Sequence, residues 1–302
     1  MSSTTQTVYS SKQSLYYSKQ TFYSLYSSKK PTPSEISDQI LNTSASGEAD
    51  SLEFANLALK DATLVLDRLF DSNDDLERHK FRVHFSAPEG YLRVVFPTCL
   101  HEAASAWLVN EYAEWRAAGL VKCEAAKAID AIPSLRIHNF GGNYSGSVKE
   151  PDFSFVPLGP NRVRREFPTV ILESGWGSEL RDRSNDCRLW HEGSGGLVSV
   201  VILVQLYMPD HQNRIRATLS ISHCSPGASA ESTTTRVDLF PIPSLNRLTP
   251  DRLRDGLDVT MGELFGGRCP KGHCPGTVLK LRVGVLRETL LPFIRQLGYQ
   301  AA

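Results

Sequence analysis

Two long apolar runs constrain the fold of this 302-residue chain most strongly. Thr169-Val-Ile-Leu-Glu173 and the segment Leu197–Tyr207 carry almost uninterrupted apolar side chains, which is typical of strands covered on both faces of a sheet. Between them, Ser178–Glu192 is predicted to form a helix that Gly193 ends. A helix between two buried strands predicts an α/β fold.

Shorter patterned segments precede these runs. Residues 81–96 alternate polar and apolar side chains around a Pro-Glu-Gly turn and predict a β-hairpin. Residues 98–118 are predicted to form a helix, and residues 134–140 and 151–156 are predicted to form strands. Together with the apolar runs they give the order helix, three strands, helix, strand. The sequence therefore predicts an α/β core of about 110 residues.

Composition excludes several classes of protein. The chain has 33 basic and 33 acidic residues, so nucleic-acid binding would have to rest on a local patch rather than on overall charge. A hydrophobic content of 41% excludes disorder of the whole chain. The longest apolar run is too short to cross a bilayer, and six scattered cysteines are typical of a reducing compartment. We expect an intracellular protein of the nucleus or cytoplasm, with no membrane span and no secretory signal.

The chain divides into four predicted segments. Residues 1–48 repeat Tyr, Ser and Lys without an apolar period and predict a disordered tail; an arm that touches nucleic acid and a targeting segment are the alternatives. Residues 49–96 are expected to hold an N-terminal helix, capped by Ser51, and the hairpin. Residues 97–222 are expected to form the core, and residues 223–302 a C-terminal extension.

Two carboxylates stand at chemically informative positions. Asp152 opens one predicted strand, and Glu173 lies in the next, within an otherwise apolar run. A carboxylate in a buried strand is costly unless it is paired, protonated or bound to a metal. Two carboxylates brought to one end of a sheet would suit a hard divalent cation such as Mg²⁺, which can activate water near a phosphate. The alternative is that Asp152 caps a turn and Glu173 pairs with an arginine.

These residues carry a resemblance to a known family. The run from Pro151-Asp152 through Glu173-Ser-Gly-Trp176 to Val200-Val-Ile-Leu-Val204 resembles the PD-(D/E)XK, or restriction-endonuclease-like, nuclease superfamily, and is similar to uncharacterised fungal members of it. The resemblance covers about residues 95–210. It implies a mixed sheet flanked by helices, Mg²⁺ or Mn²⁺ as cofactor, and hydrolysis of nucleic acid. Asp152 matches the metal-binding aspartate, and Glu173 matches the acid of the (D/E)XK strand.

The sequence departs from the family at the third motif position. A lysine is expected two residues after Glu173, and Gly175 stands there instead. Arg181 and Arg188 share one stripe of the predicted helix at residues 178–192 and are candidates to replace the lysine's charge. Arginine stays protonated, so either residue would act electrostatically rather than as a base. The alternative is a solvated basic stripe on a surface helix.

Other candidate site residues come from the remaining segments. Glu111 lies on the apolar face of the helix at residues 98–118 and is a candidate third metal ligand, because the superfamily's first core helix often supplies an acid; a buried Glu paired with an arginine is the alternative. Cys269, His273 and Cys274 place three zinc-type ligands close together, but zinc usually needs four.

Two functions remain open from the sequence. The first is a Mg²⁺-dependent nuclease in which Asp152 and Glu173 bind the metal, with Glu111 as a third ligand and Arg181 or Arg188 at the phosphate. The second is a catalytically inactive nuclease-like domain that serves as a binding or scaffold module. Gly175 favours the second function, and the retained pair of carboxylates favours the first.

Overall fold

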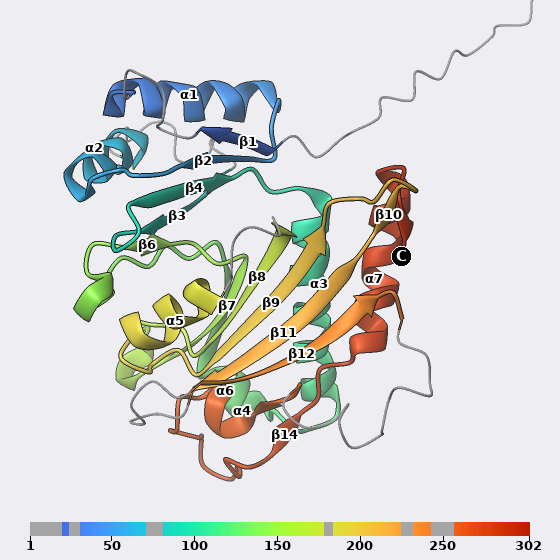
Figure 1. Cartoon of the computed structure of the whole chain (residues 1–302). Coiled ribbons are helices and arrows are strands. Elements are labelled where there is room, and N and C mark those ends of the chain that lie inside the picture. The colour runs from blue at the N-terminus through green and yellow to red at the C-terminus, as the bar shows by residue number, and fades with distance from the viewer. Residues whose placement is uncertain (1–19, 24–30, 71–80, 178–183, 225–231, 243–256) are drawn as a thin grey trace, which may run out of the picture.

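The computed structural model describes residues 20–23, 31–70, 81–177, 184–224, 232–242 and 257–302. Two sheets form its framework, and the smaller sheet lies across one end of the larger (Figure 1). The larger, main sheet has the order β12-β11-β9-β8-β7-β5. Its strands are β5 (Ile129–Pro133), β7 (Phe153–Pro157), β8 (Val170–Gly177), β9 (Val200–Tyr207), β11 (Ala217–Cys224) and β12 (Ser232–Phe240).

The main sheet is mixed. Strands β8 and β9 are parallel, and every other neighbouring pair is antiparallel. Its helices are α3 (Cys99–Ala117), α4 (Cys123–Ala126), α5 (Ser184–Gly193), α6 (Met261–Leu264) and α7 (Val283–Gln296). Helices α3 and α7 bury their apolar side chains on one face, and α5 packs on the other through a separate apolar cluster. The predicted strands at residues 151–156 and 169–173 and the helix between the apolar runs are confirmed as β7, β8 and α5. The strand predicted at residues 134–140 is wrong: the chain forms β5 just before it, and within 134–140 only Ile137 makes a β-bridge, to Lys149.

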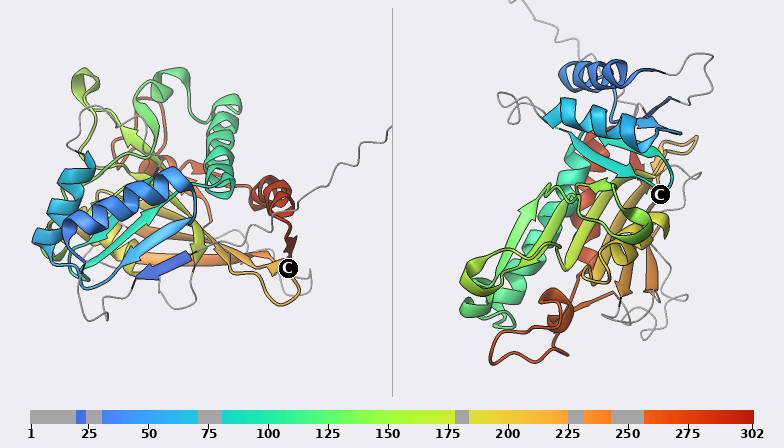
Figure 2. Two further views of the ribbon diagram at one scale, coloured as in Figure 1. Left: turned by 90° about the horizontal axis from the view of Figure 1, so that it is seen from above. Right: turned by 90° about the vertical axis from the view of Figure 1, so that its left-hand side faces the viewer.

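The smaller, N-terminal sheet has the order β1-β2-β4-β3-β6. Its strands are β1 (Gln20–Tyr23), β2 (Ser51–Phe54), β3 (Arg82–Ser86), β4 (Tyr91–Val95) and β6 (Val148–Lys149). One face packs against α1 (Pro33–Ser46) and α2 (Leu59–Phe70) around an apolar cluster of its own. Figure 2 shows from two further directions that these helices lie on the side facing away from the main sheet.

The face toward the main sheet is polar because strand side chains alternate. In β3, Val83 and Phe85 point into the cluster under α1 and α2, so Arg82 and His84 point the other way. Both side chains are nevertheless buried, because this face of the N-terminal sheet packs against the main sheet. The predicted hairpin at residues 81–96 is confirmed as β3 and β4, but its polar face is not a solvent face.

The prediction of a disordered tail over residues 1–48 is wrong for residues 33–46, which form α1. Thr32 and Glu35 form a capping box at its start, and Ile36 and Ile40 are fully buried against α2 and the sheet. Residues 1–19 and 24–30 lie outside the described residues.

Two further boundaries differ from the prediction. The helix expected from Ser51 begins at Leu59 instead, because residues 51–54 pair with β4 and β1 as strand β2. The supposed extension after residue 222 contributes β12 to the main sheet and α7 to its core, so it belongs to the core. Within the described residues, no helix has the length and apolar character needed to cross a membrane.

Candidate functional site at the junction of the two sheets

Asp152 and Glu173 lie on neighbouring strands, as the sequence predicts. Strands β7 and β8 are antiparallel, with Phe153 opposite Leu172, so the next pair along the ladder is Asp152 and Glu173. Both side chains are buried, with exposed fractions of 4% and 2%. They lie where the polar face of the N-terminal sheet meets the main sheet.

Both oxygens of the Asp152 carboxylate are engaged. Arg82 Nη1 of β3 donates to Oδ1 over 2.7 Å. The backbone N–H and the hydroxyl of Ser174 both donate to Oδ2, each over 2.5 Å. Arg82 also contacts Glu102 of α3 and the Ser134 hydroxyl, so one guanidinium joins three segments. Asp152 therefore ties the N-terminal sheet to β8.

Glu173 has different partners on the side of α5. The indole Nε1 of Trp190 donates to its Oε1 over 2.7 Å, and Lys149 Nζ lies 3.2 Å from the same oxygen. Lys149 also donates to Asp186 over 2.9 Å. His84 Nδ1 lies 4.0 Å from Glu173 Oε1. Among the described residues, Glu173 Oε2 is buried without a hydrogen-bond partner.

Burial shifts the protonation of this junction. It raises the pKa of Asp152, although Arg82 and the Ser174 hydrogen bonds act in the opposite direction. Burial also lowers the pKa of His84 well below its ordinary value, and the nearby charges of Lys149 and Arg93 lower it further. His84 is therefore neutral at pH 7.

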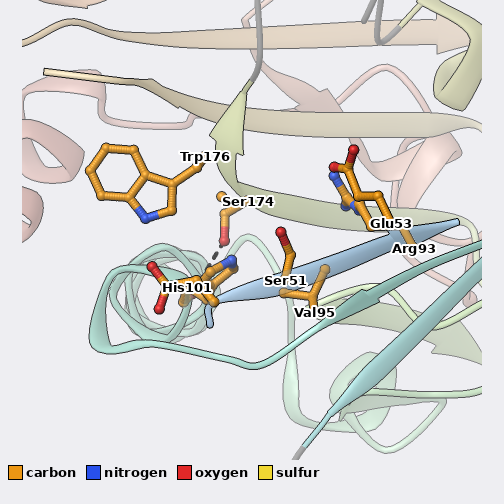
Figure 3. Close-up of a pocket in the computed structure, with 9 residues that line it drawn as sticks. Ser51, Glu53, Arg93, Val95, His101, Ser174 and Trp176 are labelled. Carbon is orange, nitrogen blue, oxygen red and sulfur yellow. Dashed lines mark hydrogen bonds between the residues drawn. The ribbon is translucent and has the colours of Figure 1, made fainter. Parts of the chain in front are cut away.

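The space at the junction is small. One cavity of about 20 Å³ is lined by both sheets and α3, and Figure 3 shows Ser51, Arg93 and Val95 on one side with His101 and Ser174 on the other. A second cavity of about 10 Å³ is lined by residues that include His84, Lys149 and Asp186. Each volume suits about one water molecule. A phosphodiester does not fit at either place in this arrangement.

The other predicted site residues are not brought to the carboxylates. Glu111 accepts hydrogen bonds from Arg282 Nε and from its backbone N–H at the start of α7. It lies ten residues along α3 from His101, which contacts Ser174, and so about 15 Å from the junction. The expectation that Glu111 points toward Asp152 and Glu173 is wrong, because Arg282 holds it.

The two arginines proposed to replace the motif lysine also differ from expectation. Arg188 is exposed on α5, where it pairs with Glu192 one helical turn later over 3.1 Å. Its guanidinium therefore does not face Glu173, and the solvated-stripe alternative describes it. Arg181 lies outside the described residues.

A lysine does stand beside Glu173, but it comes from β6. Gly175, at the motif position, has φ +139°, and a Cβ there would lie 2.7 Å from His101 Nε2. A side chain fits at that position only if the His101 ring moves. Lys149, three residues before Asp152, supplies the ammonium group instead.

Sequence reasoning missed Lys149, Arg82, His84 and Trp190. The available signal was the run Lys149-Glu-Pro-Asp152, in which three charged residues precede an apolar strand. Arg82 and His84 alternate with apolar residues, a pattern that predicts the solvent-exposed face of a hairpin. Only the stacking of the two sheets makes that face an interior.

The donor set does not fit a divalent cation as it is arranged. Glu173 Oε2 is the one feature in favour, since a buried oxygen without a partner is costly. Against it, Arg82 already forms an ion pair with Asp152, and the charges of Glu173 and Asp186 face Lys149 and Arg93. No group of three His, Cys, Asp or Glu side chains able to hold a metal occurs in the described part of the chain, which also covers Cys269, His273 and Cys274.

The described residues define a mixed α/β protein whose central sheet is flanked by helices. No family model matches the sequence, and no curated protein matches it. A solved structure from Anabaena variabilis ATCC 29413, assigned as a nuclease of DUF820, is similar with a TM-score of 0.31 and 17% identity, covering 66% of this chain and 97% of that one.

Proposed function

We propose that this chain is a nuclease-like domain that acts by binding and does not hydrolyse its partner. The observation that carries the proposal is the engagement of Asp152, whose two carboxylate oxygens accept hydrogen bonds from Arg82 and Ser174. A metal ion would have to compete with the charged guanidinium of Arg82 for this carboxylate.

The charge balance of the junction supports the same proposal. Arg82 neutralises Asp152, Lys149 lies within 3.2 Å of both Glu173 and Asp186, and Arg93 faces the same two acids, so three basic groups stand against three acidic ones. A buried network that is already neutral would carry an excess charge of about +2 if Mg²⁺ entered it, and an uncompensated buried charge is strongly unfavourable. The ion pairs therefore hold the two sheets together at the place where the resemblance to nucleases implies a metal.

A second candidate is the Mg²⁺-dependent nuclease, and the orphan Glu173 Oε2 favours it. In that case Asp152 and Glu173 would hold the ion, which supplies charge for activating water. Lys149 would take the place of the missing motif lysine beside Glu173. Arg82 would first have to release Asp152, because it occupies the carboxylate.

Calorimetry and a cleavage assay on the full chain distinguish these candidates. Mg²⁺ or Mn²⁺ is titrated into wild type, Asp152→Asn and the control Asp130→Asn, whose carboxylate forms an exposed pair with Arg164. We expect the same negligible heat from all three proteins, and no metal-dependent cleavage of plasmid DNA or RNA.

The opposite outcome is specific. Metal binding and cleavage in wild type and the Asp130→Asn control, both lost in Asp152→Asn, would overturn the binding proposal and establish the nuclease. Thermal unfolding of each variant shows whether a loss comes from the site or from the fold.

A further inference from the structure

The zero net charge of the chain hides an uneven distribution. Five basic residues belong to the segments around α4, after α6 and before β8, and Figure 1 shows α4 and α6 at the end of the main sheet where β8 begins. We call this group the basal surface: Lys122, Arg162, Arg165, Arg268 and Lys271. All are exposed except Arg165, which is half-buried.

Backbone contacts bring the three segments of the basal surface together. Lys122, just before α4, donates from Nζ to the carbonyl of Gly272 over 3.5 Å, next to Lys271. Arg162 donates from Nη1 to the carbonyl of Lys127 at the end of α4 over 3.1 Å. These residues are therefore neighbours in space although about 110–150 positions separate some of them in sequence.

The third contact crowds two guanidinium groups. Arg165 Nη1 donates to the carbonyl of Gly266 over 3.4 Å, and Thr169 fixes the same loop through a 2.7 Å hydrogen bond to the carbonyl of Leu264. Burial lowers the pKa of Arg165, and the neighbouring charge of Arg268 lowers it further. Like charges held together in this way are stabilised by an anion placed between them.

Few acids lie near the basal charges. Exposed Glu166 follows Arg165 in the chain and is one acid against five basic residues. Glu124 is 2.9 Å from Lys127, and Asp130 is 2.7 Å from Arg164, so these two acids are already paired beside the surface. Within the described ranges, none of the five basal residues forms an ion pair with a carboxylate. The surface therefore presents a local excess of positive charge on a neutral protein.

We propose that the basal surface binds the phosphate backbone of nucleic acid. Lysine and arginine pair with phosphates, and binding of this kind releases counterions without reading sequence. The inference deepens the proposed function and rests on it only for the statement that the chain acts by binding. The basal surface is distinct from the junction, since about 13 Å of strand separates Thr169 from Glu173.

The salt dependence of binding measures the contacts directly. A labelled DNA duplex of about two helical turns is titrated with the full chain at several salt concentrations. About four phosphate contacts predict an affinity loss of about 100-fold between 50 and 200 mM salt. In Lys122→Gln/Lys271→Gln, the slope of log affinity against log salt should fall by about two.

The matched control is Lys60→Gln/Arg295→Gln, which removes the same charge from exposed positions outside the basal surface. It should keep the wild-type slope. Equal slopes for the two double variants, or no duplex binding at low salt, would overturn the inference. So would binding of phosphatidylserine vesicles in place of the duplex, because the partner would then be a lipid surface.

The two proposals fail in different experiments. If the basal double variant keeps the wild-type salt dependence, the basal proposal fails, and the results of the metal titration and the cleavage assay still stand. Metal-dependent cleavage that requires Asp152 would overturn the proposed function, and the duplex affinity of the basal variants would still be measurable on the Asp152→Asn background.

Discussion

Gly175 shows how one backbone conformation decides which chemistry a site can hold. Its φ of +139° lies where side chains are strained, and its missing Cβ leaves room for the His101 ring. A lysine at the motif position would therefore meet the His101 ring, and the ammonium group beside Glu173 comes from another strand. This group belongs to Lys149 of β6.

Substitution at Gly175 should be costly for this reason. We expect Gly175→Ala to lower the free energy of unfolding by about 2–3 kcal/mol, because it adds a steric contact to backbone strain. Gly119→Ala is the control, since Gly119 also has positive φ but no heavy atom within 4 Å of its would-be Cβ. Its cost should be about 1 kcal/mol. Equal losses in urea unfolding would show that the His101 contact is unimportant.

His84 should make stability depend on pH. Burial holds the folded-state pKa well below the unfolded value of about 6.5, so between these values the unfolded chain binds more protons. The contribution of His84 to the free energy of unfolding is therefore at its maximum above about pH 6.5. It decreases as the pH falls from there toward the folded-state pKa. The slope is at most about 1.4 kcal/mol per pH unit.

Urea unfolding between about pH 5 and 6.5 tests this expectation. His84→Gln should lower the slope of the unfolding free energy against pH by the contribution of about one proton. Replacement of the exposed His138 should leave this slope unchanged. His191, whose pKa burial also lowers, makes its own contribution to the slope in both variants. An unaltered slope in His84→Gln would mean that the unfolded and folded states protonate His84 alike.

At the level of elements, α1 is the clearest departure from expectation. The residues around it are rich in Ser and Thr, a composition that predicts disorder. Ile36 and Ile40 nevertheless form one apolar stripe on the helix. We expect Ile40→Ala to cost about 2–4 kcal/mol of unfolding free energy, because Ile40 is fully buried. Ile242→Ala is the control at 61% exposure and should change stability by less than about 0.5 kcal/mol. No loss at Ile40 would restore the interpretation of a dispensable tail.

The elements that sequence reasoning did predict are those whose pattern is local. Strands β8 and β9, the hairpin β3–β4 and helix α3 each show their period within a dozen or so residues. The sequence predicts a helix over the residues of β2, because its apolar residues also fit a helical spacing. Pairing with β4 makes this segment a strand. The site follows the same rule: Asp152 and Glu173 are visible in their strands, whereas Arg82 and Lys149 join them through the stacking of two sheets.

At the scale of the whole molecule, charge is separated along the long axis. Residues 31–70 contain seven acidic and two basic residues, and Glu35, Asp38 and Glu48 line a surface groove of about 520 Å³ on α1. The basal surface lies toward the opposite end of the main sheet. An approaching polyanion is therefore repelled from the acidic groove on α1 and attracted to the basal surface, which orients it before contact.

The fifth strand of the N-terminal sheet has a consequence for how the chain is made. Strand β6 pairs with β3, yet it is translated only after α3 and β5 have followed β3 out of the ribosome. Until Lys149 and Asp152 emerge, Arg82 lacks its buried partner and β3 lacks a neighbour on one edge. The polar side chains on that face then keep the nascent hairpin hydrated, so the same charges that later lock the junction first protect an unfinished sheet from association with other chains.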